Sequence, residues 1–89
     1  MVQLTEGAAK HLIRLRKERD RGAESPRLVS RRSRLRLTFA PKPERGDQVI
    51  EHGELSVYVA SDVVESLDQS VIDAREEEGK SYLIVRRSA

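Results

Sequence analysis

The stretch Arg45–Asp73, RGDQVIEHGELSVYVASDVVESLDQSVID, holds most of the information on the fold. Two short runs, Gln48–Glu51 and Glu54–Val59, flank His52-Gly53, a two-residue connection typical of a β-hairpin because glycine adopts a positive φ without a steric clash. The second run alternates apolar and polar residues, which predicts a strand with one buried face. The stretch therefore predicts a hairpin as the centre of a small sheet.

The segment after the hairpin predicts a short helix. Asp62 and Glu65 have the spacing of a capping box, and Val63, Val64 and Leu67 follow on the same helical turns. A helix of this length contributes little by itself, so it is expected to cover one edge of the sheet.

The N-terminal segment predicts a long amphipathic helix. Thr5 has the hydroxyl of an N-cap, and the helix is expected from Glu6 to about Arg21. Its apolar stripe includes Leu12 and Leu15, while basic side chains cover the opposite side.

The remaining strands follow from alternation and from proline. Leu35, Leu37 and Phe39 alternate with Arg34 and Arg36, and prolines end this strand because they cannot donate to a ladder. The other expected strands are Val2–Leu4, Arg27–Ser30, Val71–Ala74 and Tyr82–Val85, with an acidic loop at Glu76–Lys80. The pattern predicts an α+β fold, a small mainly antiparallel β-sheet domain with one long N-terminal helix and one short helix.

The expected core consists of apolar residues on the inward faces of these elements. These residues are Leu12, Ile13, Leu35, Leu37, Phe39, Val57, Val59, Leu67, Ile72 and Ile84. In the same register Arg34 and Arg36 point to solvent.

Length and composition exclude several classes of protein. The 89 residues predict one domain, residues 1–89, and 36% of them are charged against 37% hydrophobic. There is no run of about 18 apolar residues, so no membrane span is expected, and the absence of a basic-then-apolar start favours a cytoplasmic location. With no cysteine, disulfides, thiolate nucleophiles and sulfur-based metal sites are excluded.

The net charge of +2 conceals a strong asymmetry. Residues 1–45 hold 13 Lys/Arg against 5 Asp/Glu, a net charge of +8, whereas residues 46–89 hold 4 against 10, a net charge of −6. Such a separation steers an anionic partner to one face, or it lets the two halves attract each other within the fold or across a homodimer. The sequence leaves these alternatives open.

Three short motifs resemble the A-type iron–sulfur carrier family (HesB-like proteins). They are LTEGAA at residues 4–9, Gly46-Asp47 before the hairpin, and LDQSVID at residues 67–73. The resemblance covers most of the chain and implies a compact fold with two small β units and a helix alongside them.

The same resemblance implies three cysteine ligands for iron or an iron–sulfur cluster, and this chain has none of them. The first ligand is expected near Ser30–Ser33 and the other two, in a C-x-C pair, beyond Val85, where the sequence reads Arg-Arg-Ser-Ala. A serine hydroxyl is a much poorer donor than a thiolate for this chemistry. We therefore expect a family member that lacks the cysteine ligands and binds no cofactor or metal.

The sequence signals for metal binding by histidine, for catalysis and for cell adhesion are weak. His11 and His52 are the only histidines, and we interpret them as a helix-flank and a turn residue because a metal site needs three or four convergent ligands. No serine has the motif of a nucleophile, and the paired carboxylates fit caps and turns, so an enzyme is not expected. The tripeptide Arg45-Gly46-Asp47 is interpreted as ordinary turn chemistry.

The basic strand is the one candidate contact surface. Its residues are Arg31, Arg32, Arg34 and Arg36. Guanidinium groups at alternate positions of an open strand can follow phosphates or carboxylates. With 3% aromatic residues, however, the stacking platforms of nucleic-acid readers are lacking. We interpret the cluster as a solvated face, or one paired with Glu76–Glu78; an anion or partner contact is the alternative.

The sequence thus favours a non-enzymatic protein-interaction or structural role, linked to iron–sulfur assembly through an unidentified protein partner. The alternative is an anion or nucleic-acid-binding module that uses Arg31–Arg36.

Overall fold

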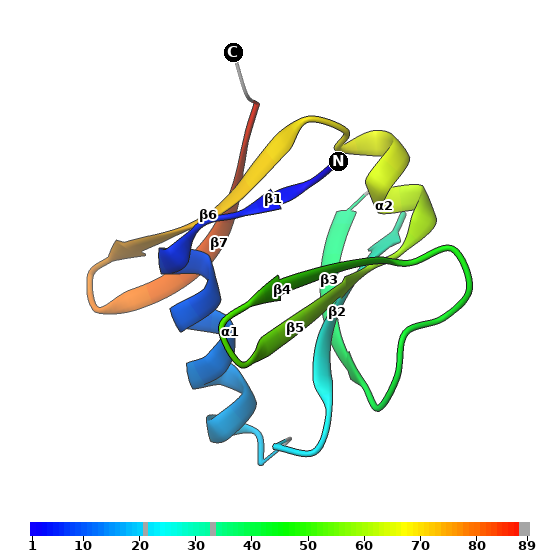
Figure 1. Cartoon of the computed structure of the whole chain (residues 1–89). Coiled ribbons are helices and arrows are strands. Elements are labelled where there is room, and N and C mark those ends of the chain that lie inside the picture. Colours follow the sequence, from blue (N-terminus) through cyan, green and yellow to red (C-terminus); the bar gives the residue numbers. More distant parts are fainter. Residues whose placement is uncertain (21, 33, 88–89) are drawn as a thin grey trace.

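The computed structural model describes residues 1–20, 22–32 and 34–87. The elements are β1 (Gln3–Leu4), α1 (Glu6–Glu18), β2 (Ser25–Arg31), β3 (Arg34–Ala40), β4 (Gln48–His52), β5 (Leu55–Val59), α2 (Ser61–Ser66), β6 (Ser70–Glu77) and β7 (Lys80–Arg87). Within the described ranges the strands form two sheets, one with the order β1-β6-β7 and one with the order β3-β2-β5-β4 (Figure 1).

Three antiparallel hairpins make most of the pairing, namely β2–β3, β4–β5 and β6–β7. The expected α+β, mainly antiparallel fold with one long and one short helix is confirmed. Two short parallel pairings, β1–β6 and β2–β5, were not predicted. They join segments distant in the sequence, which local alternation does not reveal.

Helix α1 begins where Thr5 caps it, because the Thr5 hydroxyl oxygen accepts a hydrogen bond from the Ala8 N–H at 3.1 Å. The helix ends at Glu18, earlier than expected, since Asp20 has a φ of 53°, in the left-handed region. The expected end near Arg21 falls on a residue outside the described ranges. Ala8, Ala9 and Leu12 form the buried face of the helix.

The core lies where α1, β2, β5, α2 and β6 meet. Its buried residues are Val2, Ala8, Ala9, Leu12, Leu28, Leu55, Val57, Val59, Ala60, Val63 and Ile72. Gln48 joins β4 to the N-terminal segment, because its side chain accepts from the Val2 N–H (3.1 Å) and donates to the Val2 carbonyl (3.0 Å). These contacts tie the two sheets together.

Part of the expected core is less buried than predicted. Leu12, Val57, Val59 and Ile72 are buried. The others, Ile13, Leu35, Leu37, Phe39, Leu67 and Ile84, are half-buried. Three of these six lie on β3, an edge strand that pairs on one side only. Conversely, Tyr58 is buried, at 8% exposed, although alternation along β5 places it on the face opposite Val57 and Val59.

Several local predictions were shifted. His52 belongs to β4 opposite Leu55, so the hairpin turn is Gly53-Glu54, with the positive φ at Gly53. Strands β6 and β7 extend into the expected acidic loop.

The expected capping box is wrong. Helix α2 has Ala60 at its N-cap, without a side-chain capping bond. The Asp62 carboxylate instead accepts from the N–H of Val63 inside the first turn.

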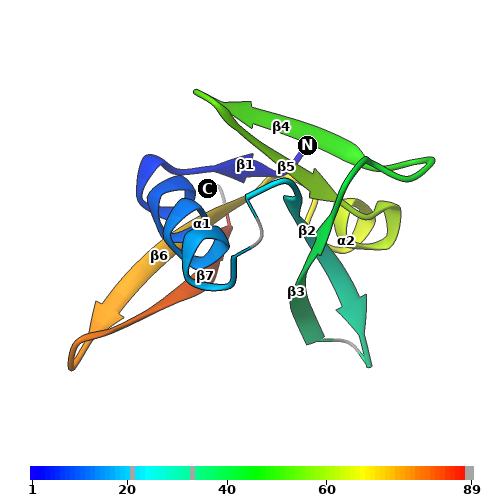
Figure 2. The ribbon, with the colours of Figure 1, turned by 90° about the horizontal axis from the view of Figure 1, so that it is seen from below.

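The β2–β3 and β6–β7 hairpins extend from the centre of the molecule in different directions (Figure 2). Helix α1 lies along β6 and β7, and α2 lies beside β2. No helix in the described part of the chain is long and apolar enough to cross a membrane.

Candidate functional site

The outward face of the β2–β3 hairpin collects the basic residues singled out in the sequence. The register places Arg31 directly opposite Arg34 and Val29 opposite Arg36. Side chains alternate along each strand, so Arg31, Arg34 and Arg36 share one face of the hairpin. Arg32 lies in the turn beside them, with a φ of 52°. We call these four exposed residues, Arg31, Arg32, Arg34 and Arg36, the arginine face.

The opposite face of the hairpin explains why the arginines point outward. Leu28, Leu35 and Leu37 occupy that face and pack on or beside the core. At the base of the hairpin, the Arg19 guanidinium lies 5.9 Å from the centroid of the Phe39 ring, a cation–π contact. The predicted outward direction of Arg34 and Arg36 agrees with this arrangement, because burying apolar side chains on one face fixes the register.

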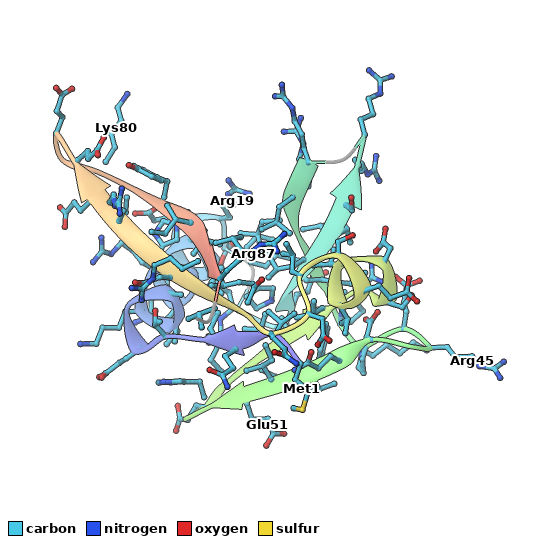
Figure 3. All side chains as sticks on the ribbon, turned by 90° about the horizontal axis from the view of Figure 1, so that it is seen from above. Met1, Arg19, Arg45, Glu51, Lys80 and Arg87 are labelled. Carbon is cyan, nitrogen blue, oxygen red and sulfur yellow. The ribbon has the colours of Figure 1, made fainter. Side chains whose placement is uncertain are left out.

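The arginine face has no anionic partner among the described residues. The ion pairs among the described residues do not include Arg31, Arg32, Arg34 or Arg36. Glu76–Glu78, a possible partner in the sequence, lie at the end of the other hairpin, which points away (Figures 2 and 3). Blue nitrogen atoms extend freely at the end of the β2–β3 hairpin in Figure 3.

Arg27, on the same face but nearer the base of the hairpin, is neutralised. Its Nε and Nη2 donate to the two oxygens of Asp47 at 3.0 and 2.9 Å, and its Nη1 lies 3.1 Å from Glu44 Oε2. The Glu44 N–H also donates to Asp47 Oδ2 at 2.9 Å. We call Arg27, Glu44 and Asp47 the Arg27 clamp, which fastens the loop between β3 and β4 onto β2.

Both side chains of the Asp47–Arg27 pair are largely shielded from solvent. The Asp47 side chain is 1% exposed and the Arg27 side chain 15%. Hydrogen bonds from Arg27, followed by the Glu44 N–H, hold the pKa of Asp47 below its usual value, although burial opposes the shift. Gly46 has a φ of 88°, which allows the loop to turn onto Arg27. The Gly46-Asp47 motif therefore stabilises the fold, and its partner Arg27 was not predicted from the sequence.

The LTEGAA and LDQSVID motifs meet in a second structural contact. The Thr5 hydroxyl donates to Asp73 Oδ1 at 2.6 Å, and Asp73 Oδ2 lies 2.8 Å from Arg86 Nη2. The hydrogen bond from Thr5 is the main cause that lowers the pKa of Asp73, with smaller contributions from the Ala74 N–H and Arg86. This contact holds the start of α1 against β6.

The place expected for the first cysteine ligand contains oxygen and hydrocarbon groups. Ser30 is half-buried and lines a small hollow with Leu35, Val63, Ser66 and Leu67. Ser33 lies outside the described residues, as do residues 88–89 beyond β7. Neither hydroxyls nor leucine side chains replace the thiolates that hold an iron–sulfur cluster.

The two histidines lie on different elements. His11 is half-buried on α1, and its Nδ1 has no hydrogen-bond partner among the described residues. Burial is the main cause that lowers the pKa of His11, and Arg14 adds to it. His52 ends β4. Among the residues described, no three His, Cys, Asp or Glu side chains gather in a group that could hold a metal ion.

Comparisons with known proteins support the fold and do not by themselves assign a function or a ligand. No family model matches the sequence, and no curated protein matches it either. Two solved structures are similar, IscA with the [2Fe-2S] cluster and Escherichia coli SufA, which is involved in the biosynthesis of iron–sulfur clusters. The first has a TM-score of 0.75 and 19% identity over 98% of this chain and 85% of that chain. The second has a TM-score of 0.80 and 19% identity over 97% and 84%. The expected A-type carrier fold is confirmed, in a chain without cysteine.

Proposed function

We propose that this protein is a non-enzymatic binding protein, built on the A-type carrier fold, which acts through contacts with another protein. In this proposal it holds no cluster on thiolates. The observation that carries it is the combination of a nearly complete fold match with a cysteine-free sequence in which Ser30 occupies the first ligand region.

The chemistry of the hairpin supports a cluster-free role. Thiolates are the usual ligands of iron–sulfur clusters, and a hydroxyl is a poor substitute. Four arginines without anionic partners in the described structure also surround the end of this hairpin, and their positive potential disfavours a cation. By contrast, the motifs that resemble those of the carrier family make the Arg27 clamp and the Thr5–Asp73 contact, both of which stabilise the fold.

The similarity to IscA and SufA supports a role beside iron–sulfur assembly. In this proposal the chain works in the cytoplasm and contacts a protein of that process, without transferring a cluster itself. A non-enzymatic role is part of this proposal, and among the described residues no His, Cys, Asp or Glu side chains gather into a group that could hold a metal ion.

The direct test is anaerobic reconstitution with ferrous iron and sulfide, followed by desalting, an iron assay and a visible absorption spectrum. We expect a colourless protein without stoichiometric iron, while IscA treated in parallel develops charge-transfer bands. Stoichiometric iron with such bands on this chain would overturn the proposal.

A second candidate function is the binding of an anion or a nucleic acid. The observation that favours it is the arginine face, which gathers four exposed guanidinium groups without anionic partners among the described residues. The salt dependence of binding tests this candidate.

A further inference from the structure

The outer edge of β3 is open. In the four-stranded sheet β3 is the first strand and pairs with β2 alone. Within the described ranges, no segment pairs with its other edge, along the seven residues Arg34–Ala40. In an antiparallel ladder alternate residues of an edge strand present an unpaired N–H and C=O outward. This edge is therefore able to accept one more strand.

The arginines are spaced for the side chains of such a strand. Arg34 and Arg36 lie two residues apart on one face, which separates them by about 7 Å. A strand added at this edge places its own alternate side chains about 5 Å from theirs. Glutamate or aspartate at alternate positions would therefore face Arg34 and Arg36, and a guanidinium pairs with a carboxylate through two parallel hydrogen bonds.

The arginine face carries no aromatic side chain of its own, which favours a peptide over a nucleic acid. Phe39 lies on the opposite face of the hairpin beside Arg19, and Tyr58 is buried. Single strands are held largely by stacking on aromatic side chains, which this face does not provide. A phosphate backbone also has no N–H groups with which to pair an open strand edge.

The positive charge also selects against a second copy of the chain at this edge. Two β3 edges brought together would juxtapose their arginines, and like charges opposite each other are destabilising. Within one chain, Arg31 and Arg34 already face each other across the hairpin. Carboxylates of a partner would relieve that repulsion.

We propose that the open edge of β3 and the arginine face together bind an acidic segment of a partner protein in extended conformation, which adds a strand to the four-stranded sheet. This inference rests on the proposed function and names the chemistry of the partner. It locates the contact at Arg34 and Arg36, with Arg31 and Arg32 at the end of the hairpin.

The test uses the whole chain, purified without added iron. The probe is a short fluorescent peptide with glutamate at alternate positions and valine or threonine between them. A second peptide has the same side chains but N-methyl groups on the amides that would pair with β3. A DNA duplex serves as a third probe, and binding is followed by fluorescence anisotropy.

We expect the unmodified peptide to bind and the N-methylated peptide to bind at least tenfold more weakly, because it cannot complete the ladder. The variant with Arg34→Ser and Arg36→Ser should lose about tenfold in affinity, at about 0.7 kcal/mol for each exposed ion pair. The control variant, Arg45→Ser with Arg75→Ser, removes the same charge at other exposed positions and should bind as the unchanged chain does. Arg45 points away from the body in Figure 3.

A hydrogen-exchange measurement adds a readout of strand pairing, since the peptide should slow exchange of the outward amides of β3. Equal binding of both peptides would overturn the proposal, as would equal losses in the two double variants or tighter binding to the duplex. These results are independent of iron reconstitution. If the chain bound the peptide and also took up a cluster, the proposed function would be contradicted, whereas the inference about peptide binding would stand.

Discussion

Asp47 is a residue whose role depends entirely on its partner. The Asp47 carboxylate, 1% exposed, joins Arg27 of β2 to the loop after β3. We expect Asp47→Asn to lower the free energy of unfolding by about 2 kcal/mol, because the half-buried Arg27 guanidinium loses part of its charge compensation. The folded-state pKa of Asp47 is depressed, so its contribution is present above the unfolded pKa of about 3.9 and is lost as the pH falls through the folded value. Urea unfolding of both proteins between neutral and acidic pH should show the stability difference narrowing at acidic pH.

Glu51→Gln is the matched control, because Glu51 is exposed and its removal changes the net charge equally. This variant should stay within about 0.5 kcal/mol of the original protein. If its pH profile were the same as that of Asp47→Asn, the clamp would not be the cause.

At the scale of elements, the two faces of the β2–β3 hairpin have opposite effects on stability. Its inner face is half-buried, so Leu37→Ala or Phe39→Ala should cost about 1–3 kcal/mol, less than Leu12→Ala in the fully buried part of α1, at about 2–5 kcal/mol. Its outer face places Arg31 opposite Arg34. We expect Arg34→Thr to raise the free energy of unfolding by a few tenths of a kcal/mol, since it removes a like-charge pair and introduces a strand-favouring residue.

Thermal unfolding at low and high salt separates these effects. The gain from Arg34→Thr should shrink as salt screens the repulsion, whereas the losses from Leu37→Ala and Leu12→Ala should persist. A destabilised Arg34→Thr protein would show that Arg34 supports the hairpin and that repulsion from Arg31 is not the dominant effect. A neutral Leu37→Ala would contradict the observed register.

At the scale of the whole molecule, charge is separated between the two diverging hairpins. The arginine face lies at the end of one, and Glu76–Glu78 lie at the end of the other (Figure 3). If the four arginines all engaged DNA phosphates, the logarithm of the affinity would fall against the logarithm of the salt concentration with a slope of about −3 to −4. We expect such binding to be weak at about 150 mM salt, because four phosphate contacts are few, salt screens them, and the arginine face carries no aromatic side chain on which unpaired bases could stack.

Arg34→Ser with Arg36→Ser should make that slope about 2 units shallower without unfolding the domain. Anisotropy titrations at several salt concentrations measure both quantities. Sub-micromolar binding to DNA at about 150 mM salt, lost in the double variant, would favour the nucleic-acid alternative over a protein partner.

The sequence alone determined the element types, because each depends on a local pattern. Alternation at Arg34–Phe39 predicted the strand and the outward direction of its arginines, and Thr5 predicted the start of the long helix. The short motifs at residues 4–9, 46–47 and 67–73 were sufficient to identify the A-type carrier fold. The lack of cysteine is known from the sequence without any structure.

Only the tertiary structure decided which residues meet across long separations. The pairing of β2 with β5, the contact of Arg27 with Asp47 and the bond from Thr5 to Asp73 join residues that no local pattern links. It also decided that β3 is an edge strand, which left its leucines half-buried and its arginines unpaired in the described structure. The physical reason is that alternation reports the two faces of a strand, whereas exposure depends on what the rest of the chain places against each face and edge.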